Sequence, residues 1–203
     1  MAGKLEFFFD IVSPTAYLAW FLAPGVADRS GAELVLRPMF LGGVMQGAGN
    51  QPPGTVPAKG AYLGQDLRRC ARYHGLPFHS NPAFPFNTLP ILRAAHGLAG
   101  EPEAQYRLLD AAFRHAWGQP DPKNLGEASA RAAMYEAEGL DGVRLEALAN
   151  DPANKDSVKA TTEEAVERGV FGAPTFFVGD EMFFGHDRLD YAERALKGEV
   201  APA

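Results

Sequence analysis

The stretch FFFDIVSPTAYLAW, residues 7–20, contains the junction that decides the fold. It begins inside a nearly continuous apolar run, Leu5 to Val12, which is short and bounded by charge and therefore predicts a strand buried on both faces. From Thr15 to Ala27 the apolar residues follow helical spacing, so a helix is expected directly after the strand. Ser13-Pro14 stands between the two elements. The pair could be a plain helix cap, or it could aim a hydroxyl at a sulfur or an anion.

Downstream of this junction, the run ELVLRPMF at Glu33 to Phe40 predicts a second strand. A strand, a helix and a strand within about 40 residues indicate two parallel strands joined by a crossover helix. The Gly- and Pro-rich stretch from Leu41 to Gly60 then predicts a long loop, of the kind that is usually functional or disordered.

The middle of the chain carries no convincing strand pattern. Helical patterns follow one another there, separated by breaks rich in Gly and Pro, over residues 62–74, 88–98, 102–117, 125–138, 142–149 and 153–168. The pattern changes again at PTFFVGDEMFFG, where two short apolar runs around Gly179-Asp180 are typical of a hairpin. DRLDYAERALKG, at Asp187 to Gly198, predicts a final amphipathic helix.

Together these elements predict an α/β protein with the order β-α-β, an all-helical insertion, then β-β-α. This is the element order of a thioredoxin-like fold with a helical insertion. We expect residues 1–41 to form the first part of the thioredoxin-like domain, residues 42–154 the insertion, and residues 155–203 the second part.

The composition is that of an ordinary soluble protein, with 203 residues, 46% of them hydrophobic and 22% charged. A formal net charge of −6 without a long basic run argues against nucleic acid or an anionic membrane as the main partner. No apolar run approaches the roughly 18–20 residues that span a bilayer. Glu6 and Asp10 interrupt the N-terminal apolar run, so we expect no signal peptide and a cytoplasmic location. The single cysteine, Cys70, excludes an internal disulfide and a dithiol motif, and we expect it to be buried.

Two motifs meet at the predicted reactive end of such a fold. The end of the first strand, at the start of the first helix, is where a thioredoxin-like protein carries its reactive sulfur. Here the position holds Ser13, so the sulfur would have to be brought in, and the hydroxyl could donate a hydrogen bond to a bound thiolate. Ala173-Pro174 precedes the hairpin, where such folds have a cis bond that leaves the backbone N–H and C=O of Ala173 free for a peptide ligand. A trans proline at the start of an edge strand is the alternative.

Two further stretches could bind a ligand or serve only the fold. In GHDR, Asp187 could cap the last helix or receive an ammonium group, while His186 alone is more often a surface residue. In GNQPPGTVPAKG, Asn50 and Lys59 could serve a turn and a solvated surface, or wall a pocket for an anionic ligand. His79, His96 and His115 show no metal-ligand spacing, so no metal site is expected.

Four segments in this order and spacing resemble the 2-hydroxychromene-2-carboxylate isomerases, relatives of the kappa-class glutathione transferases with a DsbA-like thioredoxin fold. They are FFFDIVSPTAYLA, RPMFLGGVMQGAGNQPPGTVPAKGAYLGQDLRR, FPFNTLPILRA and TEEAVERGVFGAPTFFVGDEMFFGHDRLD. The resemblance covers nearly the whole chain. It implies glutathione as cofactor, a small aromatic enone carboxylate as substrate and a homodimer.

The resemblance also implies roles for residues at the thiol end of glutathione. Ser13 matches the serine that hydrogen-bonds the thiolate, and Ala173 matches the residue whose backbone pairs with the cysteinyl unit. Pro174 matches the cis-proline that follows it. This end of the site would supply the catalytic hydroxyl.

The remaining matched residues are implied to hold the rest of the ligand. Asn50 and Lys59 match loop residues that line the glutathione or substrate pocket. His186 and Asp187 match the pair that holds the γ-glutamyl end. The family more often has Ser, Asn or Gln where His186 stands, so its backbone N–H is expected to serve.

The activity implied is the interconversion of 2-hydroxychromene-2-carboxylate and trans-o-hydroxybenzylidenepyruvate in aromatic catabolism, by reversible thiolate addition. A kappa-class transferase or peroxidase acting on another electrophile would share the glutathione half of the site. A thiol–disulfide oxidoreductase is disfavoured because no cysteine pair occupies Ser13 to Ala16. A glutathione- or peptide-binding module without catalysis is the third alternative.

Overall fold

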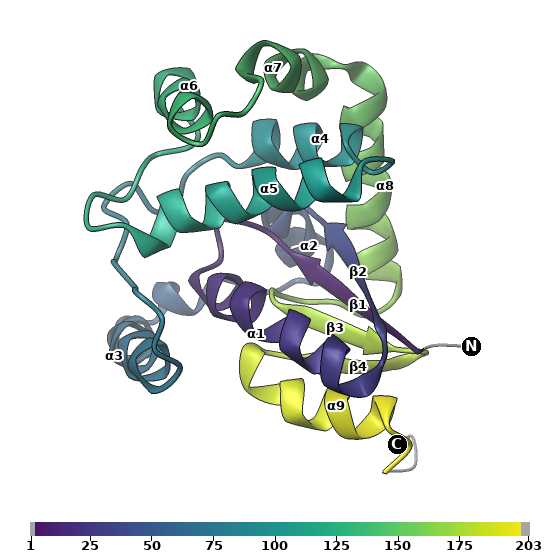
Figure 1. Ribbon diagram of the computed structural model, residues 1–203. Coiled ribbons are helices and arrows are strands. Elements are labelled where there is room, and N and C mark those ends of the chain that lie inside the picture. Colours follow the sequence, from purple (N-terminus) through teal and green to yellow (C-terminus); the bar gives the residue numbers. More distant parts are fainter. Residues whose placement is uncertain (1–2, 200–203) are drawn as a thin grey trace.

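Four strands form one mixed sheet in the computed structural model, which describes residues 3–199. The strand order is β2-β1-β3-β4, with bounds β1 Lys4–Phe9, β2 Glu33–Pro38, β3 Thr175–Val178 and β4 Glu181–Phe184. β1 and β2 are parallel, as the β-α-β pattern predicts, and β3 runs antiparallel to β1 and β4. The chain therefore has the α/β, thioredoxin-like fold that the element order predicts (Figure 1).

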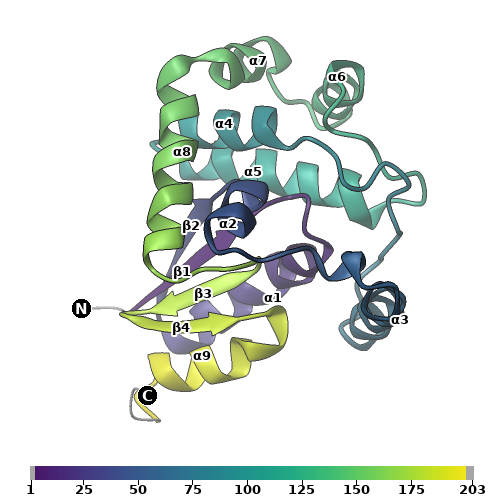
Figure 2. The ribbon, with the colours of Figure 1, turned by 180° about the vertical axis from the view of Figure 1, so that it is seen from behind.

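β1 is buried on both faces, as its continuous apolar pattern predicts. Phe7 and Phe9 pack into the larger core with α1 (Pro14–Ser30), while Phe8 belongs to a second, smaller core on the other side. In the ribbon, α1 and α9 (Leu189–Leu196) cover one face, and α2 (Leu41–Gly47) and α8 (Pro152–Glu167) cover the other (Figures 1 and 2). A strand between two helical layers has no solvated side, so both sets of its side chains must be apolar.

The stretch from Leu41 to Gly60 is not the loop that its composition predicts. It contains α2 (Leu41–Gly47), the 3-10 turn η1 (Pro53–Thr55) and the first turn of α3 (Pro57–Tyr73). Two glycines of α2 lie so close to α8 that a Cβ at Gly43 would be 3.0 Å from Thr162 and one at Gly47 would be 2.9 Å from Val166. Close packing against α8 thus outweighs the low helix propensity of glycine.

The helical middle of the chain follows the predicted order with shifted ends. The elements are α4 (Leu89–Gly97), α5 (Pro102–Phe113), the π-helical turn η2 (Arg114–Gly118), α6 (Ala128–Ala137), α7 (Gly142–Asn150) and α8 (Pro152–Glu167). The 3-10 turn η3 (His186–Arg188) precedes α9. No helix between residues 3 and 199 is long and apolar enough to cross a membrane. The division into residues 1–41, 42–154 and 155–203 stays a prediction.

The pairing register brings four chain segments to one end of the sheet. Phe8 lies opposite Arg37 on one side and Thr175 on the other, and Thr175 lies opposite Phe184. The segments that follow β1, β2 and β4, and the segment that precedes β3, therefore meet at the same end. Ser13 and Ala173 lie on two of these segments.

Candidate functional site

Ser13 connects the start of α1 to the segment before β3. Its Oγ accepts the N–H of Ala16 at 3.2 Å, which confirms that it caps the helix. The same hydroxyl lies 3.1 Å from the carbonyl oxygen of Ala173, which is 160 residues away in sequence. The side chain is 4% exposed, so the cap and the hydroxyl directed at the neighbouring segment occur together.

The Ala173-Pro174 peptide bond is cis, as expected for this fold. The carbonyl of Ala173 is not free, because the hydroxyls of Ser13 and Thr15 both lie within donating distance, at 3.1 Å and 3.0 Å. The Ala173 N–H has no acceptor among the residues described, although Ala173 is only 8% exposed. The N–H is thus the backbone group open to a ligand, while the carbonyl already has protein donors.

Few amides at the start of α1 are open to an anion. The Ser13 N–H donates to the Asp10 carbonyl at 3.0 Å, Pro14 has no N–H, and the Ala16 N–H donates to Ser13. Among the residues described, the Thr15 N–H is the amide of this turn that has no acceptor. An anion here would therefore meet one amide, the Ser13 hydroxyl and the positive end of the helix dipole.

Asp10 is a buried carboxyl group that sequence reasoning missed. It is fully buried, and its two oxygens accept the N–H of Val12 at 3.1 Å and that of Leu41 at 2.9 Å. Burial raises the pKa of Asp10, while hydrogen bonds from the Thr88 hydroxyl and from Leu41 and Val12 act in the opposite direction. Asp10 thereby ties the segment that carries Ser13 to the start of α2. In the sequence, the feature that could have indicated this role is a single acidic residue at the end of a strand predicted to be buried on both faces.

Asn50 lies beside the cis-proline segment, whereas Lys59 is not tied to it. The Nδ2 of Asn50 donates to the carbonyl of Phe171 at 2.8 Å, two residues before Ala173. Lys59 is exposed in the first turn of α3, and no hydrogen bond or ion pair to another described residue fixes its ammonium group. The structure thus fixes Asn50 beside the cis-proline segment, whereas no contact between described residues ties Lys59 to the site.

His186 and Asp187 reach the site through η3. The N–H of Gly185 donates to the carbonyl of Pro174 at 2.9 Å, which places the pair next to the cis-proline. A Cβ at Gly185 would lie 2.5 Å from Asp187 Oδ1, and its φ of 105° also favours glycine. The Asp187 carboxylate therefore packs against the backbone of Gly185, where a side chain would not fit.

Asp187 does not cap the last helix, which is one of the two roles that the sequence left open for it. α9 begins two residues later, at Leu189, and has no side-chain cap. Asp187 is exposed, and its carboxylate lies 3.1 Å from the guanidinium of Arg188. The carboxylate is thus exposed and has no capping role, and a further cationic group would share it with Arg188.

Charged groups of α3 lie close enough to η3 to act on His186. Burial lowers the pKa of His186, with smaller effects of Asp187, His74 and Asp66, the last two of which lie on α3. Cys70, also on α3, is half-buried and not buried as expected. Burial raises the pKa of its thiol, which disfavours the reactive thiolate form. Over residues 3–199, no three His, Cys, Asp or Glu side chains gather in a way that could hold a metal ion.

Trp117 is a second contact that sequence reasoning missed. The π-helical turn η2 directs its indole N–H to the carbonyl of Ile11, two residues before Ser13, at 2.8 Å. The ring of Phe78 stacks on that of Trp117, with 6.1 Å between the ring centres. The half-exposed ring of Phe84 has its centre 5.9 Å from that of Trp117. An aromatic cluster is therefore fixed to the segment that carries Ser13, and single π-helical turns are frequent at functional sites.

The family model described as a DSBA-like thioredoxin domain matches residues 4–197. The chain is 33% identical over 199 residues to a 2-hydroxychromene-2-carboxylate isomerase of Sphingobium xenophagum, covering 97% of this chain and 99% of the relative. It is 29% identical to glutathione S-transferase kappa 1 of Homo sapiens, over 98% of this chain and 95% of the relative. The solved structure of a selenomethionine 2-hydroxychromene-2-carboxylate isomerase superposes with a TM-score of 0.83 at 28% identity, covering 97% of this chain and 95% of that one.

Proposed function

The chain belongs to the DSBA-like thioredoxin domain family, and from this premise we propose that it is a glutathione-dependent isomerase. Its substrates would be 2-hydroxychromene-2-carboxylate and trans-o-hydroxybenzylidenepyruvate, the pair that the resemblance implies. The observation that carries the proposal is Ser13, a buried hydroxyl beside the cis-proline segment where a redox protein of this fold needs a cysteine. With no cysteine there, thiol chemistry requires a thiol from a ligand.

The residues around Ser13 fit a glutathione molecule. The N–H of Ala173, next to Pro174, lacks an acceptor among the residues described and could pair with the cysteinyl backbone. The exposed carboxylate of Asp187 would receive the α-ammonium of the γ-glutamyl unit, with the backbone of His186 beside it. On the α2–α3 side, Asn50 and Lys59 would receive a carboxylate of glutathione or of the substrate.

Bound glutathione would supply a nucleophilic thiolate, whose reversible addition to an enone allows a double bond to rotate. The task of the protein is to favour that thiolate, since a free thiol has a pKa of about 8.5. Lowering this pKa by about 2 units requires about 2.7 kcal/mol of preferential stabilisation. A hydrogen bond from the Ser13 hydroxyl to a charged acceptor contributes about 1.5–3 kcal/mol, and the end of α1 adds to it.

Replacing Ser13 tests the proposal. Ser13→Ala should raise the pKa of the bound glutathione thiol by about 1–2 units, because the charged acceptor loses its donor. Turnover at pH 7 should fall about 3- to 25-fold, because the thiolate fraction falls by that factor when the pKa rises from about 6.5 by 1–2 units. The thiolate absorbance of the complex is titrated with pH, and binding of S-methylglutathione shows that the site is still folded.

The control for this experiment is Ser157→Ala, which removes an exposed hydroxyl that bonds only within α8. It should leave the bound-thiol pKa unchanged. A Ser13→Ala complex with the same thiol pKa as the wild type would contradict the proposed role of Ser13.

A kappa-class-like transferase or peroxidase is the alternative, supported by the similarity to a kappa-class transferase over nearly the whole chain. Both functions would use the same thiolate on different electrophiles. Turnover of a generic aryl halide without turnover of the chromene carboxylate would favour the alternative. The homodimer implied by the resemblance is likewise a proposal, and sedimentation analysis tests it.

A further inference from the structure

Three oxygen atoms form a tight group at the start of α1. Ser13 Oγ lies 2.9 Å from Thr15 Oγ1, and both lie close to the carbonyl oxygen of Ala173, at 3.1 Å and 3.0 Å. Ser13 and Ala173 are buried, and Thr15 is half-buried. Two hydroxyls and one carbonyl therefore share a small space that admits little water.

The number of protons in this group limits what Ser13 can do. Each hydroxyl has one proton to donate. Ser13 Oγ already accepts the N–H of Ala16, so its own proton must point to Ala173, to Thr15 or to a ligand. If Ser13 alone served the buried Ala173 carbonyl, donation to a ligand would leave that carbonyl without a donor, which is costly in a buried place.

Thr15 removes this conflict. Its hydroxyl is within donating distance of the same carbonyl, so it can satisfy Ala173 while Ser13 turns its proton elsewhere. We propose that Thr15 is a positioning residue, whose hydroxyl holds the Ala173 carbonyl and so releases the Ser13 proton for a bound thiolate. This role of Thr15 rests on the proposed binding of glutathione. In that role, Thr15 touches neither the sulfur nor the substrate.

The geometry also predicts that Thr15 acts only through Ser13. Removing the Thr15 hydroxyl should raise the pKa of a bound thiol, because the thiolate form needs the Ser13 proton. The same change should have little effect on the binding of a ligand whose sulfur is methylated and uncharged. It should have no effect when Ser13 is already alanine.

Thr15→Val tests this, because valine keeps the shape and the β-branch of threonine and loses only the hydroxyl. Thr15→Ser, which keeps the hydroxyl, is the matched control. In the glutathione complex, Thr15→Val should raise the bound-thiol pKa by about 0.5–1 unit, while Thr15→Ser should stay close to the wild type. The dissociation constant for S-methylglutathione should change less than about twofold in both variants, or about 0.4 kcal/mol.

A double-mutant cycle completes the test. In a Ser13→Ala background, Thr15→Val should cause no further change in the bound-thiol pKa. An unchanged pKa in the single Thr15→Val variant, or an equal rise in both backgrounds, would overturn the role of Thr15 and leave the proposed function standing. A wild-type protein that binds no glutathione, or binds it with an ordinary thiol pKa, would overturn both.

Discussion

The Asp10 carboxylate fixes the backbone of the segment that leads to Ser13. It accepts one amide from this segment, at Val12, and one from the start of α2, at Leu41. Two amides and the nearby Thr88 hydroxyl suit an ionised carboxylate, whereas complete burial disfavours the charge. Burial is the larger effect, so the pKa of Asp10 is raised in the folded protein.

The raised pKa of Asp10 gives stability a defined dependence on pH. The folded protein holds this proton more tightly than the unfolded chain, whose Asp pKa is about 3.9. The stability that the proton contributes is therefore complete below about pH 4 and is lost as the pH rises through the folded pKa. Measured by urea unfolding from pH 4 to 7, the wild type should lose free energy of unfolding relative to Asp10→Asn.

The control for Asp10 is Asp121→Asn, which removes one carboxylate at an exposed position. It accounts for the loss of a single negative charge from the protein. A free-energy difference between the wild type and Asp10→Asn that stays constant over this pH range would contradict the linkage.

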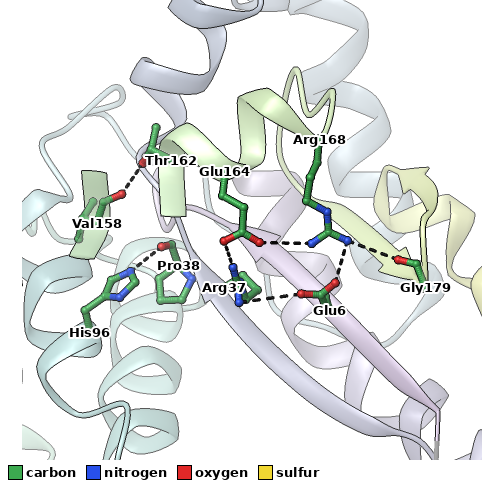
Figure 3. A network of polar contacts seen from close by, with 9 residues as sticks. All are labelled: Glu6, Arg37, Pro38, His96, Val158, Thr162, Glu164, Arg168 and Gly179. Atoms are coloured by element: carbon green, nitrogen blue, oxygen red, sulfur yellow. Dashed lines mark hydrogen bonds and ion pairs between the residues drawn. The ribbon is translucent and has the colours of Figure 1, made fainter. Parts of the chain in front are cut away.

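At the scale of elements, α4 is attached to the end of β2 through His96. Its Nε2 lies 2.8 Å from the carbonyl oxygen of Pro38, and Figure 3 shows the ring directed at that carbonyl. The contact joins the helical insertion to the sheet near the segment that leads into α2. Burial lowers the pKa of His96, and Arg37 acts in the same direction, while the bond to Pro38 opposes them.

Acid should lower the stability of the fold at His96, because burial disfavours its charged form. The folded pKa of His96 lies below the unfolded value of about 6.5, so its contribution is present above that pH and is lost as the pH falls toward the folded pKa. His96→Gln keeps a donor and removes the titration. Between pH 7 and 5, the wild-type free energy of unfolding should fall relative to this variant. Parallel pH profiles for the two proteins would contradict the assignment.

The sequence predicts these elements well where a pattern is local. β1 and the hairpin are apolar runs, and their strand character follows from the runs themselves. α2 could not be predicted, because Gly43 and Gly47 favour a helix only once α8 packs against them.

The residues of the candidate site also fall into those that the sequence predicts and those that it does not. Ser13 and Ala173 follow from the element order, since a thioredoxin-like plan brings their segments together. Thr15, Asp10 and Trp117 do not, because their roles depend on hydrogen bonds to partners up to 158 residues away in sequence or on complete burial.

At the scale of the whole molecule, four charged side chains join β1, β2 and α8 over the smaller core (Figure 3). Arg168 donates to Glu6 at 2.8 Å and lies 3.5 Å from Glu164, while Arg37 pairs with the same two carboxylates. The guanidinium of Arg168 also lies 3.8 Å from the ring centre of Phe177. Because these side chains are only partly exposed and each has more than one partner, the network should contribute more than separate surface ion pairs.

Arg168→Met should therefore lower the free energy of unfolding by about 1–3 kcal/mol, since Glu6 and Glu164 would be left to share Arg37 and the ring of Phe177 would lose its cation. Lys159→Met is the matched control, because its pair with Glu163, at 3.6 Å, is exposed on α8, the helix that Arg168 follows. It should change the free energy by less than about 0.5 kcal/mol. Urea unfolding at neutral pH measures both variants. Equal losses in the two would mean that Arg168 acts as an ordinary surface charge and that the sheet and α8 are held together by their apolar contacts alone.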